Sequence, residues 1–172
     1  PKNILYQAGN TGVAAWANAL NAAMLASCFK LSGHTALMER YRDSAINAYA
    51  YASSQSVANQ MLDKRQSVGA GEISGKDFKV AAAAFLYDVT GDVDYENDLA
   101  SSSSVTSSSS PVYTGTSNQL YAVAGYLFTR QKINKTTLFN NMKSAIIAEA
   151  KSKEANYTLS GPSRRASDND HG

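Results

Sequence analysis

Apolar residues recur at three- and four-residue steps along most of the chain, and this spacing places side chains on one face of an α-helix. In the first such stretch, Thr11 is a suitable N-cap and Gly33 can adopt the left-handed conformation that ends a helix. The positions expected to face a core are Val13, Trp16, Ala17, Leu20, Met24, Cys28 and Leu31. The pattern therefore predicts a helix from Thr11 to about Leu31.

A second helix is expected from about Thr35, and Ser32-Gly33-His34 would close the two helices into a hairpin with His34 at the surface. Its inward positions are Leu37, Met38, Tyr41, Ala45, Ala48, Tyr49 and Ala52. Cys28 is the only cysteine, which excludes an internal disulfide and a cysteine-based zinc site. We expect this cysteine to be buried as a small apolar side chain.

A third helix is predicted from about Lys76 to the stop signal Thr90-Gly91-Asp92, after an aperiodic stretch at residues 60–75 that we interpret as a loop. Its inward residues are expected to be Phe78, Ala81, Ala82, Phe85, Leu86 and Val89. Asp77 suits a capping role at the start of this helix, and Asp92 can cap the next short one. The acidic run Asp92, Asp94, Glu96 and Asp98 is interpreted as a solvated face.

Two further helices are predicted, at about residues 117–130 and from an Asn134 cap to about Lys153. Their inward residues are expected to be Leu120, Val123, Ala124, Leu127 and Phe128 in the first and Leu138, Met142, Ala145 and Ile146 in the second. A serine-rich loop at residues 101–111 precedes them, because serine tracts solvate well and pack poorly. No segment alternates with period two, so we predict an all-α fold without a sheet.

Composition supports one packed domain and excludes several classes of partner. The 172 residues are 44% hydrophobic and 17% charged, so we expect residues 1–172 to form a single α-helical domain. The net charge of +2 and the scattered basic residues predict no nucleic-acid partner. No apolar run approaches the roughly 20 residues that span a bilayer, so no membrane partner is expected. The motifs of phosphate loops, serine hydrolases and zinc proteases are missing, and we assign no cofactor.

The segment AAAAFLYDVTGDVDYEND, residues 81–98, resembles a stretch of family 9 glycoside hydrolases in which a helix ends in leucine-tyrosine and threonine-glycine-aspartate. The earlier GNTGVAAWANALNAAMLASCFK, residues 9–30, is similar to the alanine-rich helix that this family places upstream. Gly71-Glu72 and the helix YAVAGYLFTR, residues 121–130, follow in the expected order. Threonine-glycine-aspartate turns also occur in other α/α toroid carbohydrate enzymes, which stay an alternative, as does a plain helical bundle.

The resemblance implies that the helical hairpins form part of an (α/α)6 toroid and that the enzyme hydrolyses β-1,4-glucans of the cellulose type with inversion. In that reaction one carboxylic acid protonates the leaving oxygen, and a carboxylate activates water on the opposite face of the sugar. The aspartate-rich base motif and the acid glutamate of the family have no match here, so no catalytic residue is assigned. We therefore expect an internal portion of a larger, secreted catalytic domain, inactive alone and completed by the rest of that domain.

The C-terminal segment GPSRRASDNDHG, residues 161–172, carries the candidate substrate-binding residues. These are Arg164, Arg165, Asp168, Asp170 and His171, whose planar donors and carboxylate acceptors match sugar hydroxyls. A solvated loop with local arginine–aspartate pairs is the equal alternative, and no metal site is assigned because the full calcium-loop spacing is missing. For the whole chain, the alternative function is a non-catalytic helical-repeat module that binds glycan or protein.

Tyrosine is the one abundant aromatic residue, with ten copies against one tryptophan. Tyr113, Tyr121, Tyr126 and Tyr157 lie in the half of the sequence nearest the polar C-terminal segment. Tyrosine rings stack on sugar rings, but on a helical stripe they more often pack in the core. We expect Tyr126 in particular to be a core residue. Asn134-Lys135-Thr136 and Asn156-Tyr157-Thr158 are N-glycosylation triplets, which suit a secreted protein.

Overall fold

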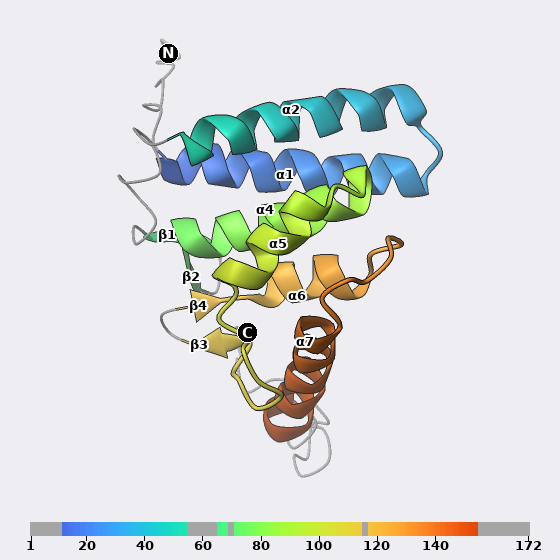
Figure 1. The fold of residues 1–172 in the computed structure, drawn as a ribbon. Coiled ribbons are helices and arrows are strands. Elements are labelled where there is room, and N and C mark those ends of the chain that lie inside the picture. The colour runs from blue at the N-terminus through green and yellow to red at the C-terminus, as the bar shows by residue number, and fades with distance from the viewer. Residues whose placement is uncertain (1–11, 55–64, 69–70, 115–116, 155–172) are drawn as a thin grey trace, which may run out of the picture.

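The computed structural model describes residues 12–54, 65–68, 71–114 and 117–154, and it is mainly helical (Figure 1). The helices are α1 (Gly12–Leu31), α2 (Thr35–Ser53), α4 (Gly75–Thr90), α5 (Val93–Ser102), α6 (Leu120–Leu127) and α7 (Thr136–Glu149). A π-helical segment, Ala150–Glu154, continues α7. The all-α prediction is confirmed at this level, and none of the described helices is both long and apolar enough to cross a membrane.

Both predicted glycine stops are confirmed. Gly33 between α1 and α2 and Gly91 between α4 and α5 have φ angles of 76° and 74°, in the left-handed region that glycine enters without steric cost. After Gly91, the Asp92 side chain accepts a hydrogen bond from the Asp94 backbone N–H and so caps α5, as predicted. Each stop reverses the chain and closes a helical hairpin.

The helices lie in an ordered array (Figure 1). α1, α4 and α6 lie side by side and run in the same direction. In the chain, α2 follows α1 and α5 follows α4, and each of these two helices runs back in the opposite direction. α4 is the central member, in contact with both α1 and α6. It is therefore buried on nearly all sides, including Val80, Ala83 and Tyr87 outside the predicted stripe.

The inward face of α1 combines small and bulky side chains: Val13, Trp16 and Leu20 are buried as predicted, and alanines lie between them. Ala19, Ala23 and Ala26 have no exposed surface, whereas Cys28 is exposed and Leu31 is 71% exposed. The predicted burial of Cys28 and Leu31 is therefore wrong. The reason is that α1 packs against both α2 and α4, and small side chains let helix axes approach closely. On α2, Ala45, Tyr49 and Ala52 are buried as predicted, but Leu37 is exposed.

The face of α6 is also rotated from the prediction. Leu120, Ala124 and Phe128 were expected inside, but all are exposed, and Phe128 ends the helix with 84% of its surface accessible. Gly125 is buried, and a Cβ atom there would lie 2.9 Å from the Phe85 ring. The absence of a side chain at Gly125 lets α6 approach α4 closely, which explains the rotation.

Two short antiparallel hairpins correct the prediction that no sheet forms. β1 (Arg65–Val68) pairs with β2 (Gly71–Ser74), with Arg65 opposite Ser74. β3 (Tyr113–Thr114) pairs with β4 (Ser117–Asn118), which replaces the first turn of the predicted helix 117–130. Within the predicted loop at residues 60–75, the described residues 65–68 and 71–74 thus form a hairpin. Strands of two to four residues are too short to give a clear period-two pattern in the sequence.

The serine-rich segment forms a connection between α5 and β3, although Ser101 and Ser102 belong to the last turn of α5. Val105 and Val112 are fully buried and anchor its two ends. Ser107, Ser108 and Ser109 are exposed. The segment is therefore a surface loop, as predicted, with apolar anchors beneath it.

Candidate functional site

The predicted sugar-binding residues Arg164, Arg165, Asp168, Asp170 and His171 lie outside the described residues, as does Tyr157. The described part contains three buried carboxylates, Asp77, Asp88 and Glu96, and a cavity lined mainly by polar side chains. The hydrogen-bond partners of each carboxylate determine whether it can take part in catalysis. The predicted core position of Tyr126 is confirmed, because this residue has no exposed surface.

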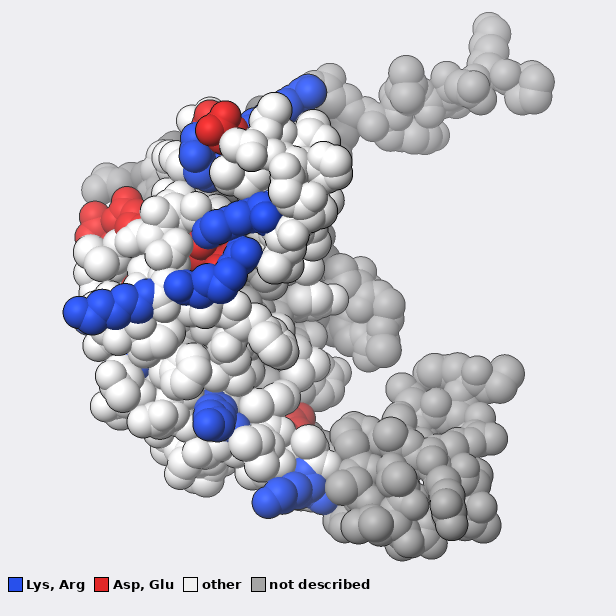
Figure 2. Space-filling view, turned by 90° about the vertical axis from the view of Figure 1, so that its right-hand side faces the viewer, with Lys and Arg blue, Asp and Glu red and all other residues white. Residues whose placement is uncertain are grey.

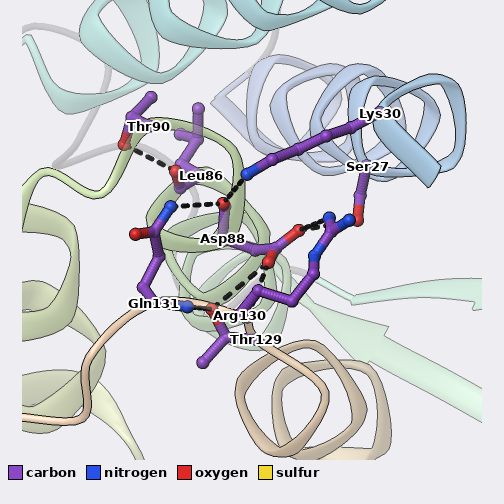
Figure 3. Close-up of polar contacts among 8 residues, drawn as sticks. All are labelled: Ser27, Lys30, Leu86, Asp88, Thr90, Thr129, Arg130 and Gln131. Atoms are coloured by element: carbon purple, nitrogen blue, oxygen red, sulfur yellow. Dashed lines mark hydrogen bonds and ion pairs between the residues drawn. The ribbon is translucent and has the colours of Figure 1, made fainter. Parts of the chain in front are cut away.

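The first buried carboxylate is Asp88, near the C-terminal end of α4 (Figure 3). Its Oδ2 accepts hydrogen bonds from the Ser27 hydroxyl on α1 at 2.8 Å and from the Arg130 guanidinium at 3.0 Å. Its Oδ1 accepts from the Arg130 backbone N–H at 3.1 Å and the Thr129 hydroxyl at 3.3 Å. The carboxylate therefore ties α1 and the segment after α6 to α4.

The backbone carbonyl of the same aspartate is also occupied. The Lys30 ammonium donates to it at 2.6 Å and the Gln131 side-chain amide at 2.9 Å (Figure 3). Carbonyl groups at the C-terminal end of a helix carry partial negative charge, which explains why Lys30 and Arg130 gather there. We call Ser27, Lys30, Asp88, Arg130 and Gln131 the Asp88 cluster.

Electrostatics within the Asp88 cluster favour the ionised form of the Asp88 carboxyl. Burial opposes the charge, but hydrogen bonds from Arg130 and Ser27 outweigh burial and hold the pKa of Asp88 below its ordinary value. Burial lowers the pKa of Lys30, the Asp88 charge opposes that effect, and the nearby Arg130 charge adds to it. A carboxylate so fully paired is suited to holding helix ends together and unsuited to donating a proton.

The second buried carboxylate is Glu96 on α5, 1% exposed. Its Oε1 accepts from the Tyr126 hydroxyl at 2.5 Å and from the backbone N–H groups of Asn134 and Lys135 at 2.9 and 3.1 Å. Its Oε2 accepts from the Asn134 side-chain amide at 2.8 Å. The prediction that this acidic run is a solvated face is therefore wrong for Glu96, because the turn before α7 supplies three donors.

The same network explains why Asn134 does not cap α7. Its side chain points to Glu96 and the Tyr87 hydroxyl, and the N-cap position is Lys135, whose side chain makes no capping bond. Burial opposes ionisation of Glu96, but the bonds from Tyr126, Asn134 and Lys135 prevail and lower its pKa. Burial and the hydrogen bond to Glu96 raise the pKa of Tyr126. This network fixes the segment between α6 and α7.

The third buried carboxylate, Asp77, has the predicted capping role. With Ser74 it forms a reciprocal capping box at the start of α4. Its Oδ1 also accepts from the Gln119 amide at 2.7 Å and the Ser117 hydroxyl at 3.0 Å. Asp77 therefore links the start of α4 to β4 and the start of α6.

The cavity lies between the end of α5, the serine-rich loop and the start of α7, with a volume of about 550 Å³. Most of its lining side chains are uncharged and polar, and Lys135 is the one charged residue among them. The lining comprises Ala100, Ser103, Val105, Thr106, Asn134, Lys135, Thr136, Thr137, Leu138 and Asn141. We call it the α5–α7 cavity.

Surface charge does not form an extended patch on the face shown in Figure 2. Lys and Arg side chains lie there as separate strips, with acidic side chains beside some of them. Seen from this side, the described residues form an arc. Among these residues, no three His, Cys, Asp or Glu side chains lie close enough together to hold a metal ion.

Comparison with known proteins adds no family assignment: no protein-family model matches the chain, and no curated protein matches it.

Sequence reasoning missed the Asp88 cluster and the burial of Glu96. A signal for Asp88 was present, because this aspartate interrupts the apolar run AAAAFLYDVT and a charge within such a run needs a buried partner. No comparable signal marked its partners Ser27 and Arg130, which are distant in the sequence. The partners of Glu96 come from a turn whose position only the tertiary fold determines.

Proposed function

We propose that this chain forms consecutive helical hairpins of an (α/α)6 toroid in a secreted family 9 glycoside hydrolase that cleaves β-1,4-glucans with inversion. Secretion follows from the proposed substrate, because a polysaccharide of the cellulose type is too large to enter a cell intact. The sequence resemblance at residues 81–98 suggests the family, and the helix array supports the architecture.

The observation that carries the proposal is the parallel alignment of α1, α4 and α6 (Figure 1). In an α/α toroid, the first helices of successive hairpins run parallel around an inner ring and the second helices return outside them. The order of α1, α2, α4, α5 and α6 in the chain and in space fits this scheme. An up-and-down bundle would instead place antiparallel helices next to each other throughout.

The buried carboxylates of the described part are unsuited to the inverting reaction. A general acid needs a raised pKa, whereas the pKa values of Asp88 and Glu96 are lowered by their hydrogen bonds. Inverting carboxylates also face each other across about 6.5–9.5 Å, with space for substrate and water between them. Asp77, Asp88 and Glu96 instead contact protein groups. We therefore assign the catalytic pair to parts of the enzyme beyond the described residues.

Substrate contact is proposed for the C-terminal residues Arg164, Arg165, Asp168, Asp170 and His171. Their guanidinium, carboxylate and imidazole groups would bind sugar hydroxyls without taking part in bond cleavage. Loss of such contacts weakens substrate and transition-state binding equally, so KM rises more than kcat falls.

The test is an assay of the protein encoded by the whole gene that contains this chain. The proposal predicts an upstream aspartate-rich motif, a downstream glutamate and hydrolysis of soluble cello-oligosaccharides. Changing Arg165 and Asp168 together to Ala should raise KM at least about fivefold with a smaller change in kcat. A protein that binds glycan without cleaving it would instead support the non-catalytic helical module.

A further inference from the structure

The α5–α7 cavity has the chemistry of a saccharide-binding site, and its lining residues differ from those proposed above for substrate contact. Its volume of about 550 Å³ lies within the range of small-molecule sites, about 300–1,000 Å³. It lies between the end of α5, the serine-rich loop and the start of α7.

The cavity is lined by hydroxyl groups with unused hydrogen-bonding capacity. The side-chain hydroxyls of Thr106, Thr136 and Thr137 have no hydrogen-bond partner among the described residues. Each hydroxyl can donate one hydrogen bond and accept two, as a sugar hydroxyl can. A ligand that carries several hydroxyl groups is therefore matched to this lining.

The backbone that carries these exposed threonines is held from two sides. On the loop side, the Asn141 side-chain amide donates to the Thr106 carbonyl at 2.9 Å, and buried Val105 anchors the loop. On the helix side, Glu96 holds the turn before α7 through the backbone N–H groups of Asn134 and Lys135. The cavity is thus preformed, which reduces the entropic cost of binding.

Apolar side chains complete the match to a sugar ring. Ala100 and Leu138 are half-buried in the lining and can contact the C–H groups of a pyranose face. The absence of acidic side chains from this lining argues against a cation, and its low charge argues against a polyanion. The lining contains no aromatic residue, so stacking contributes nothing and the affinity should be low.

We propose that the α5–α7 cavity binds a β-1,4-linked gluco-oligosaccharide as a secondary, non-catalytic site, with a dissociation constant on the order of 1 mM. The choice of β-1,4-glucan rests on the proposed function. Such a site would hold a polysaccharide chain against the surface of the enzyme while another segment of that chain is cleaved.

The test is a titration of the 172-residue chain with a soluble β-1,4-linked glucose tetramer, followed by nuclear magnetic resonance of the backbone amides. We expect shifts concentrated at the residues that line the cavity. Thr137→Val and Thr106→Val each remove one hydroxyl, and each should weaken binding about fivefold. Ser108→Ala, on the exposed part of the same loop, is the matched control and should leave binding unchanged.

Three results would overturn this proposal. The first is that no amide signal shifts when the sugar concentration is raised to about 20 times the expected dissociation constant of about 1 mM. The second is that the shifts are the same in both threonine variants as in the unchanged chain. The third is that inorganic phosphate causes the shifts and the sugar does not. Phosphate is the relevant competitor because the first turn of α7 presents free backbone N–H groups at the cavity. Hydrolysis by the whole-gene protein without these shifts would refute the secondary site alone, whereas shifts without hydrolysis would refute the proposed function alone.

Discussion

At the scale of single residues, buried carboxylates with several donors determine how the segments meet. Glu96 is buried and accepts four hydrogen bonds from Tyr126, Asn134 and Lys135. A buried acceptor that loses its partners costs more than the net value of each bond, because the group stays desolvated. Glu96 should therefore be among the most sensitive positions in the chain.

Glu96→Gln keeps the shape of the side chain but places an amide N–H₂ group among the four donors. We expect a loss of about 1–3 kcal/mol of unfolding free energy, measured by urea denaturation. Asp94→Asn on the same helix is the matched control, since Asp94 is exposed, and should cost less than about 1 kcal/mol. Equal effects of the two variants would show that Glu96 is not buried as described.

Gly91 and Gly33 provide a second test at this scale, because both have positive φ but different surroundings. A Cβ at Gly33 meets no atom within 4 Å, whereas one at Gly91 lies 3.1 Å from the Gln131 Oε1. Gly33→Ala should cost about 1–2 kcal/mol from backbone strain alone, and Gly91→Val more, since a β-branched side chain also displaces Gln131. Unchanged melting temperatures would contradict the left-handed helix stops.

At the scale of elements, periodicity and stop signals predicted the long helices and their hairpins well. Both ends of α1 and α4, and the start of α2, lie within about one or two residues of the predicted ones, the usual uncertainty of helix ends. The predicted faces of α1 and α6 were less accurate, because Ala23 and Gly125 are buried by close helix contacts while Leu31 and Phe128 are exposed. A periodic pattern assigns large apolar residues to the core, but it does not show where two helices approach so closely that small residues are buried instead.

The polar contacts between elements could not be predicted from local patterns. Asp88 meets Ser27 and Arg130 across separations of 61 and 42 residues, and the sequence between them gives no register for that meeting. The β1–β2 and β3–β4 hairpins were missed because their strands are too short for a periodic signal. The proposed sugar-binding segment stays a prediction, since it lies outside the described residues.

The contacts that Asp88 makes between helices should make the free energy of unfolding depend on pH. Because the pKa of Asp88 is lower in the folded chain than its ordinary value of 3.8, its contribution is fully present above about pH 4. That contribution should disappear as the pH falls through the lowered folded-state pKa. Asp88→Asn should therefore destabilise the chain at pH 7 and flatten the fall of melting temperature below pH 4, compared with Asp94→Asn. Parallel acid profiles of the two variants would contradict the cluster.

At the scale of the whole molecule, the described residues form a helical scaffold, and the proposed catalytic groups are supplied elsewhere. The buried carboxylates Asp77, Asp88 and Glu96 join elements, and the proposed catalytic pair lies beyond the described residues. The isolated 172-residue chain should therefore fold as a mainly helical protein and fail to hydrolyse cello-oligosaccharides. Circular dichroism provides the control for folding. Robust cleavage that Asp168→Ala or Asp170→Ala abolishes would place the acid and base in the C-terminal segment instead.

The most direct measurement of the central claim is the anomeric configuration of the first product released by the protein that the whole gene encodes. Proton nuclear magnetic resonance can follow a soluble β-1,4-linked gluco-oligosaccharide during early hydrolysis, before mutarotation mixes the anomers. Inversion by a carboxylic acid and a carboxylate on opposite faces predicts that the α-anomer appears first. Initial release of the β-anomer, or no hydrolysis by the folded protein, would contradict the assignment to an inverting family 9 glycoside hydrolase.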